Sequence, residues 1–198
     1  PPQYKHPRTA LDPPTADPPS LDSSPLRSSG FRIPLTGRLT TVYILNDMDV
    51  YLETDRLTLR WFTPDDLHLI VELDSDPAVK RYIDNGAPVD HADLVETLEW
   101  WLTHYPREVG YGFWAAYEKA AGSFIGWFHF RPGDAAGPLE PELGYRLRKQ
   151  AWGKGFGTEG SIALIEHGFR ELGVERVYAQ TMAVNIGSRR VMEKAGMR

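Results

Sequence analysis

The chain has 198 residues, a hydrophobic share of 41% and a formal net charge of −5 from 22 basic and 27 acidic side chains. That length suits one domain plus a tail. No apolar run approaches the ~18 residues needed to cross a bilayer. No block of Lys or Arg could follow a phosphate backbone, so we expect neither a membrane nor a nucleic acid as partner. The lack of cysteine excludes disulfides, thiolate metal sites and a cysteine nucleophile, and it makes a cytoplasmic location the default expectation.

The first 47 residues differ in composition from the rest. They hold nine of the sixteen prolines, among Ser, Thr and Asp. Such a segment buries too little apolar surface to offset the entropy of ordering it. We therefore predict that residues 1–47 are a disordered or appended segment and that the folded domain covers residues 48–198. A tail with a binding role is the alternative.

From residue 51 onward, hydrophobic periodicity and Gly/Pro turns predict a series of short elements. Three neighbouring strands separated by such turns indicate an antiparallel meander. The predicted fold class is therefore α/β (α+β), a mixed and mainly antiparallel sheet flanked by helices. The predicted order is a strand at 56–62, a helix from the N-cap Thr63 to about 73, a helix at 90–105, strands at 111–117, 123–130 and 142–148, a helix at 157–172 with Ile162, Ile165 and Phe169 on one face, a strand at 174–182 and a helix at 186–194.

A glycine-rich turn opens the long helix. Gly153, Gly155 and Gly157 alternate just before it, with Lys149 and Lys154 beside them. Glycine permits positive φ and close approach of an anion, and the first N–H groups of a helix lack partners. The pattern thus favours a phosphate-binding nest. A merely tight strand-to-helix connection is the alternative.

Residues 155–160 also match G-x-G-x-x-G, with Glu175 at a distance suited to a ribose. That fingerprint normally lies in an early parallel βαβ unit, whereas here it follows the predicted meander. We interpret the match as incidental, and a dinucleotide-binding oxidoreductase is kept as an alternative function.

Several blocks along the chain resemble the GCN5-related N-acetyltransferase (GNAT) superfamily. Gln150-x-x-Gly153-x-Gly155 resembles its pyrophosphate loop. Leu57-Thr-Leu-Arg60, Glu142-Leu-Gly-Tyr-Arg-Leu and Asn185-Ile-Gly-Ser188-Arg-Arg-Val-Met resemble blocks of the ribosomal-protein N-terminal acetyltransferase-like branch. The resemblance covers residues 51–198.

The resemblance implies that acetyl-CoA is the cosubstrate and that a primary amine, a protein N-terminus or a small molecule, attacks it directly. In this family the pantetheine arm lies between two strands that splay apart, and the pyrophosphate lies on the loop. A bulge at Gly144 is compatible with that splay. No metal is expected, because the histidines show no ligand spacing. The implied cofactor-binding residues are Tyr145, Arg146, Leu147, Gln150, Trp152, Gly153, Lys154, Gly155, Gly157, Thr158, Asn185 and Arg190.

Two catalytic candidates follow from the same comparison. Glu142, at the head of the fourth family strand, is the candidate general base, and an exposed charge is the alternative. Ser188 lies where relatives carry a serine near the sulfur, although capping of the last helix together with Asn185 explains it equally. Arg190 and its neighbour Arg189 either reach the 3′-phosphate or form a solvated helix face.

The aromatic residues and the end of the chain carry further expectations. Most tryptophans, Trp114 and Trp127 included, are predicted to be core, and one of the adjacent pair Trp100 and Trp101 is expected to be exposed. Relatives continue past residue 198 with two more strands. The sequence therefore predicts a truncated domain with an open sheet edge where chains could pair. A catalytically silent acetyl-CoA-binding fragment is thus an alternative to an active transferase.

Overall fold

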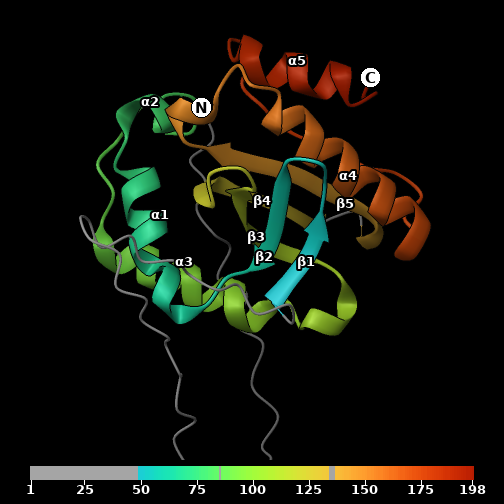
Figure 1. Ribbon diagram of the computed structural model, residues 1–198, viewed down its shortest axis with the longest axis horizontal. Coiled ribbons are helices and arrows are strands. Elements are labelled where there is room, and N and C mark those ends of the chain that lie inside the picture. Colours follow the sequence, from blue (N-terminus) through green and yellow to red (C-terminus); the bar gives the residue numbers. More distant parts are fainter. Residues whose placement is uncertain (1–48, 85, 134–136) are drawn as a thin grey trace, which may run out of the picture. The chain divides into compact units, whose positions relative to one another are not determined.

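The computed structural model describes residues 49–84, 86–133 and 137–198, all within the unit Tyr43–Arg198. The predicted tail of residues 1–47 lies outside them. The described residues form a five-stranded antiparallel sheet in the order β1-β2-β3-β4-β5 (Figure 1). Its strands are β1 (Val50–Glu53), β2 (Leu57–Trp61), β3 (Gly112–Glu118), β4 (Ser123–Gly133) and β5 (Gly137–Leu147).

Helices flank this sheet. The α-helices are α1 (Leu67–Asp74), α2 (Pro77–Lys80), α3 (His91–His104), α4 (Phe156–Glu171) and α5 (Ile186–Lys194), and the 3₁₀ turns are η2 (Pro64–Asp66), η3 (Arg107–Val109) and η4 (Lys149–Ala151). The predicted meander, the helix at 90–105 and the last two helices are confirmed within a few residues. β1 and α2 were not predicted. The first predicted helix is divided into η2 and α1.

The predicted strand at 174–182 is wrong in its length. Only one bridge forms there, a parallel pair between Glu142 and Tyr178. The N–H of Leu143 donates to the Tyr178 carbonyl at 2.8 Å, and the N–H of Tyr178 donates to the Pro141 carbonyl at 3.2 Å. Apolar, β-branched composition favoured a full strand, but the chain follows β5 only as far as residue 178 and then no longer pairs with it.

Two hydrophobic cores lie on opposite faces of the sheet. Successive side chains of a strand point to opposite faces, so Trp127 packs with Trp101 of α3 while Phe128 packs with Leu164 of α4. Figure 1 shows α1 and α3 to one side of the sheet and α4 to the other. Trp114 is fully buried and Trp127 is 7% exposed, which confirms the core prediction. Of the adjacent tryptophans, Trp101 is buried and Trp100 is 38% exposed.

The packed face of α4 is built from small residues. An added Cβ at Gly160 would overlap the Phe128 ring, and one at Gly168 would lie 2.7 Å from the Phe130 ring. The apolar stripe singled out in the sequence faces mostly outward, because Ile162 is 36% exposed and Phe169 is 48% exposed. Glycine lets this helix lie directly on the phenylalanines of β4.

The predicted bulge at Gly144 is also wrong. Gly144 pairs in register with His129 of β4, and the register of β4 and β5 shifts only near Gly133. A Cβ at Gly144 would lie 2.5 Å from Cε1 of the His129 ring. The glycine therefore makes room for the imidazole and does not interrupt the ladder.

Candidate functional site

β5 parts from the segment after α4 beside the loop that begins this helix. Backbone polar groups of Leu143 point toward Tyr178, and those of Tyr145 point to the same side because strand backbone alternates. The neighbouring Leu147 carbonyl already accepts a hydrogen bond from the Trp152 indole at 2.8 Å. The edge beyond the bridge thus offers the backbone of Tyr145 to a ligand, with Leu147 partly occupied.

The loop before α4 has the geometry of an anion nest. Gly155 is its N-cap, with φ +85° in the left-handed region, and Phe156 follows in helical conformation. A left-handed residue followed by a right-handed one directs successive N–H groups to one point, here those of residues 155–157. Gly153 also has positive φ, +74°.

The nest is narrower than the sequence predicted. The N–H of Trp152 donates to the Lys149 carbonyl at 3.1 Å, so it does not belong to the nest. Among the hydrogen bonds within the described residues, none uses the N–H of Gly153, Lys154 or Gly155. Those of Phe156, Gly157 and Thr158 lie in the first turn of α4, where helical partners are absent.

The carboxylate of Glu159, also in the first turn of α4, binds residues of the turn between β1 and β2. Glu159 accepts hydrogen bonds from the Thr54 hydroxyl at 2.5 Å, from the Arg56 N–H at 2.9 Å and from Arg56 Nε at 2.6 Å. Burial raises the pKa of the Glu159 carboxyl, but these hydrogen bonds and the Arg56 charge outweigh burial and leave the pKa below its ordinary value. Arg56 also donates to the Lys154 carbonyl at 3.0 Å.

The start of α5 adjoins β5 through two hydroxyls. The Asn185 side chain accepts a hydrogen bond from the Ser188 N–H at 3.1 Å, so the predicted capping role is confirmed. The phenolic O–H of Tyr145 donates a hydrogen bond to Ser188 Oγ at 3.4 Å. Burial raises the pKa of Tyr145, and the Ser188 contact only partly opposes this effect. Tyr145 is therefore a protonated donor at neutral pH.

Glu142 is not an exposed charge. It is 8% exposed and forms an ion pair with Arg131 at 2.6 Å. Four residues along β5, Arg146 points to the same face, where it pairs with Asp74 of α1 and lies over the Trp127 ring. The side chain of Arg146 thus belongs to the face covered by α1 and not to the nest.

His129 lies between these two ion pairs on the same sheet face. Both ring nitrogens are shielded from solvent and have no hydrogen-bond partner among the residues that the structure describes. Burial, with a smaller contribution from Arg131 and Arg146, lowers the pKa of His129 to about 3. The imidazole is therefore neutral at pH 7.

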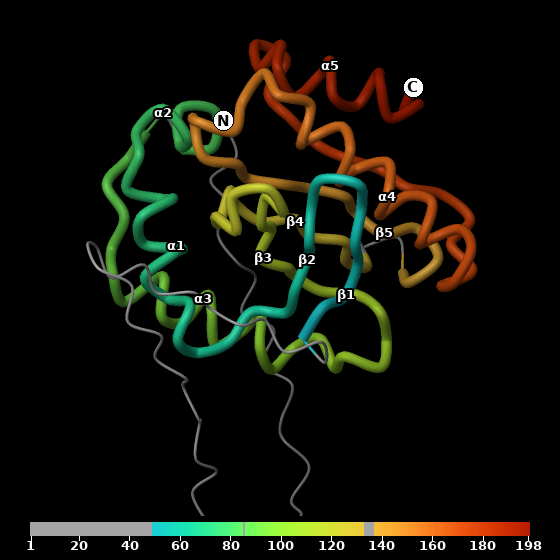
Figure 2. The backbone as a smooth tube through the Cα atoms, in the orientation of Figure 1, coloured from blue at the N-terminus to red at the C-terminus, as the bar shows by residue number. Residues whose placement is uncertain are grey.

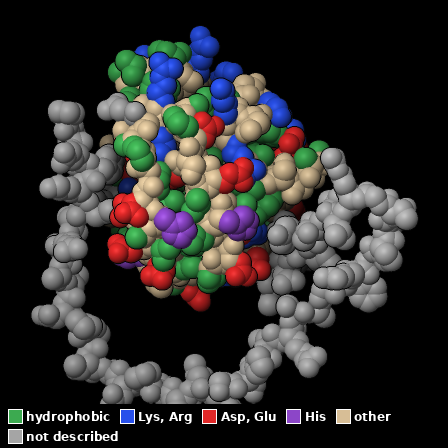
Figure 3. All heavy atoms as spheres, turned by 90° about the vertical axis from the view of Figure 1, so that its left-hand side faces the viewer, with side chains coloured by type: hydrophobic (Ala, Val, Ile, Leu, Met, Phe, Trp, Pro, Cys, Tyr) green, Lys and Arg blue, Asp and Glu red, His purple; other side chains and the backbone are tan. Residues whose placement is uncertain are grey.

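Basic side chains gather toward the end of the domain that carries α5. In the face shown in Figure 3, Lys and Arg lie mostly in the upper part and Asp and Glu mostly in the lower part. The predicted cofactor residues Gln150, Lys154 and Arg190 are solvent-exposed. This distribution suits an anionic ligand at the start of α4 and α5.

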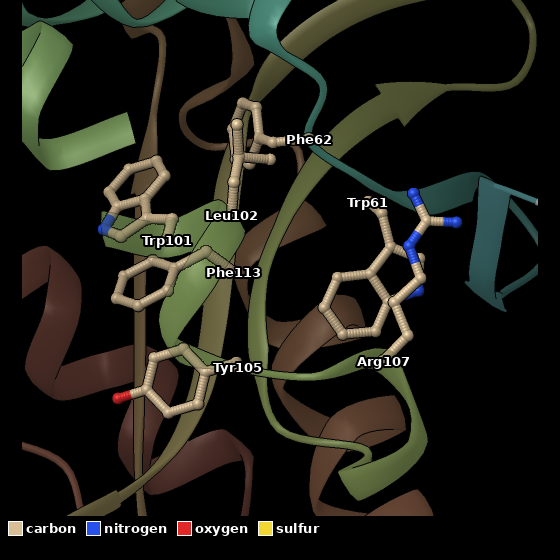
Figure 4. A pocket seen from close by; sticks show the side chains of 7 residues that line it. All are labelled: Trp61, Phe62, Trp101, Leu102, Tyr105, Arg107 and Phe113. Atoms are coloured by element: carbon tan, nitrogen blue, oxygen red, sulfur yellow. The ribbon is translucent and has the colours of Figure 1, made fainter. Parts of the chain in front are cut away.

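A small pocket lies away from the nest, at the end of α3 (Figure 4). It has a volume of about 90 Å³ and is lined by Trp61, Phe62, Trp101, Leu102, Tyr105, Arg107 and Phe113. Ligand pockets for molecules of drug size have roughly 300–1,000 Å³. This pocket therefore has room for a fragment of a ligand only.

Neither a metal-binding cluster nor a membrane-spanning helix is found in the described part of the chain. It has no group of three or more His, Asp or Glu arranged for a metal ion. None of its helices is long and apolar enough to cross a bilayer. The G-x-G-x-x-G match follows an antiparallel strand, β5, so the parallel βαβ setting of a dinucleotide fold is missing there.

Sequence reasoning missed Thr54, Arg56, His129 and the Tyr145 side chain. Arg56 and Glu159 are 103 positions apart, and no local pattern indicates that they meet. For His129 a signal was present, because a histidine in the middle of an alternating aromatic strand opposite a glycine indicates a buried ring.

The structure thus combines an antiparallel sheet, a parted edge of β5 and a loop with the geometry of an anion nest, and comparison supplies the family. Residues 56–198 match the family described as Acetyltransferase (GNAT) domain. The chain belongs to the GNAT acetyltransferase family. This membership confirms the resemblance and the fold class.

Individual relatives agree. The chain is 28% identical over 152 residues to the FsC-acetyl coenzyme A-N(2)-transacetylase of Aspergillus fumigatus, covering 74% of this chain and 64% of that protein. It is 33% identical over 149 residues to the uncharacterized protein YkkB of Bacillus subtilis, covering 74% and 84%. A GNAT-family acetyltransferase from Bacillus anthracis has a TM-score of 0.62 at 25% identity, covering 74% of this chain and 82% of that structure.

Proposed function

We propose that the protein is an acetyl-CoA-dependent N-acetyltransferase that acts on a primary amine. The observation that carries the proposal is the nest at residues 153–158 beside the edge of β5 that, within the described part of the chain, has no strand partner after the bridge to Tyr178. The nest would hold the diphosphate, and the edge would pair with the pantetheine amides. Family membership and the name of the Aspergillus relative, which specifies acetyl coenzyme A and transfer to nitrogen, support the same reading.

The residues of this chain fit such a transfer. Acetyl transfer needs a neutral amine, a polarised thioester carbonyl and a stabilised thiolate. We assign removal of the amine proton to Glu142, with water as an intermediary, because this residue lies in β5 at the bridge to Tyr178, where the strand then parts from the following segment. We assign hydrogen bonding to the thiolate to the Ser188 hydroxyl, whose own oxygen accepts from Tyr145. N–H groups of the parted edge polarise the carbonyl.

Binding is the first test. We expect isothermal titration calorimetry to show acetyl-CoA binding and Gly155→Val to weaken it at least about tenfold, ~1.4 kcal/mol. A side chain there is strained at φ +85° and approaches Arg56 Nη2 within 3.4 Å. Gly173→Val is the matched control, since Gly173 also has positive φ, +67°, and an added Cβ there would have no described atom within 4 Å. Equal affinity of both variants would refute the proposed site.

Turnover is the second test. Release of free thiol from acetyl-CoA, measured over a panel of amines that includes peptides with free N-termini and small polyamines, identifies an active transferase and its acceptor class. Binding without thiol release on any amine would instead support the silent acetyl-CoA-binding alternative. The cytoplasmic location and the pairing of chains through a sheet edge stay predictions.

A further inference from the structure

The side chain of Arg56 connects the turn between β1 and β2 with the loop that begins α4. Figure 2 shows this turn beside the first part of α4. Arg56 Nη1 donates to the Lys154 carbonyl at 3.0 Å, while Nε and Nη2 contact Glu159 Oε2 at 2.6 and 2.5 Å. The guanidinium also lies over the Phe156 ring, 4.7 Å from its centre. One side chain thus holds residues on both sides of Gly155.

This contact fixes the direction of a peptide group in the nest. A trans peptide is planar, and its C=O and N–H point in opposite directions. Because the Lys154 carbonyl points toward Arg56, the N–H of Gly155 points away from Arg56. That N–H is one of the donors of the nest. If this peptide turned over, a carbonyl oxygen would replace the donor and would repel an anion.

Glu159 places a negative charge in the first turn of the helix whose N–H groups form the nest. An unpaired carboxylate there would repel a bound diphosphate. It is instead turned toward the β1–β2 turn, where Thr54 and Arg56 donate to both of its oxygens. The side chain of Glu159 is only 19% exposed. Its charge therefore holds Arg56 in place and is neutralised there.

We propose that Arg56 and Glu159 are positioning residues for acetyl-CoA, which together hold the Lys154–Gly155 peptide with its N–H toward the diphosphate. This inference rests on the proposed function, which it deepens. Direct binding of a phosphate by Arg56 is the competing explanation. The structure favours positioning, because Nε, Nη1 and Nη2 of Arg56 are already engaged by Lys154 and Glu159.

The variant Glu159→Gln separates the two explanations by the sign of its effect. It removes a negative charge near the nest and releases Arg56. If Arg56 bound phosphate directly, acetyl-CoA would bind more tightly to this variant. If Arg56 instead positions the Lys154–Gly155 peptide, this variant removes the support of that peptide, and we expect acetyl-CoA binding about tenfold weaker. Arg56→Gln should weaken binding to the same extent, and the double variant no further.

Matched controls come from the far end of the same helix. Glu166 and Arg170 form an exposed pair on α4 at 3.9 Å, so Glu166→Gln and Arg170→Gln remove similar charges without touching the loop. Both should bind acetyl-CoA as the unmodified chain does. Arg56→Lys keeps the charge but not the forked geometry, and it should not restore affinity.

A donor without phosphates tests whether the effect passes through the nest. S-acetylpantetheine carries the thioester arm alone, so kcat/KM with this donor should be the same in Glu159→Gln, Arg56→Gln and the unmodified chain. Equal losses with both donors would mean a general structural role and would overturn the inference, as would unchanged or tighter acetyl-CoA binding by Glu159→Gln. Failure of the unmodified chain to bind acetyl-CoA would instead refute the proposed function, and this inference with it.

Discussion

The phenol of Tyr145 and the hydroxyl of Ser188 lie 3.4 Å apart, where β5 meets the start of α5. The distance is long for a pair of hydroxyls, but the direction of donation is informative. Tyr145 keeps its proton because burial raises its pKa. When Tyr145 donates to Ser188, the Ser188 proton is left for a third group, which in the proposed reaction is the departing thiolate.

This relay predicts the effect of Ser188→Ala. We expect kcat to fall on the order of tenfold or more, with little change in the affinity for acetyl-CoA. Tyr145→Phe should lower kcat less, because Ser188 keeps its own proton. Steady-state kinetics with thiol detection measure both. A change confined to KM would contradict a role at the thiolate.

Glu142→Gln tests the proposed base. A neutral amide cannot accept the amine proton, so kcat should fall about a hundredfold, while acetyl-CoA affinity stays within about twofold. Glu140→Gln is the matched control, because Glu140 lies two residues earlier in β5 and pairs with Arg176 at 3.3 Å on the surface. Equal kcat values for the two variants would exclude Glu142 as the base.

Gly160→Ala tests the close packing of α4. The added methyl group would overlap the Phe128 ring, and overpacking of a core costs about 1–3 kcal/mol. We expect the free energy of unfolding in urea to fall by that amount. Gly187→Ala in α5 should have the opposite effect, up to about 1 kcal/mol of stabilisation, because its nearest neighbour lies at 3.6 Å. Similar changes in both variants would argue against this packing.

His129 predicts a specific dependence of stability on pH. Its pKa is about 3 in the folded protein because of burial, near Arg131 and Arg146, and about 6.5 when unfolded. As pH falls below 6.5, the unfolded chain binds a proton that the folded chain does not, so stability is lost. Between pH 7 and pH 5 the loss from this residue is about 2 kcal/mol.

The variant His129→Phe isolates that contribution. Its free energy of unfolding should fall less between pH 7 and pH 5 than that of the unmodified chain, by about 2 kcal/mol. Chemical denaturation at several pH values supplies the comparison. Parallel pH profiles would show that His129 takes up a proton without unfolding.

Local chemistry explains which parts of the fold were predictable. Asp90 caps α3 by accepting from the Ala92 N–H at 2.9 Å, and the N-cap Thr63 precedes a proline at the start of η2. Such signals act within a few residues and are visible in the sequence. The partners of α4 were not predictable in this way, because Gly160 and Gly168 are small only in relation to phenylalanines on a distant strand.

The same distinction applies to the site. Gly153 and Gly155 predicted the backbone geometry of the loop, because positive φ favours glycine whatever the tertiary context, and both have positive φ. The sequence also placed Ser188 and Asn185 together, since an N-cap contact spans three residues. It did not indicate that the Trp152 indole donates a hydrogen bond to the Leu147 carbonyl or that Glu142 forms an ion pair with Arg131. Those facts depend on side-chain directions that only the folded chain fixes.

The glycine face of α4 has a consequence for which donors the protein can use. Gly160 and Gly168 leave no room for a side chain between helix and sheet, because an added Cβ would overlap the Phe128 ring or lie 2.7 Å from the Phe130 ring. In the proposed reaction, this close packing sets the spacing between the helix start and the parted edge of β5. An acyl carrier with a shorter arm would then leave its thioester short of the acceptor.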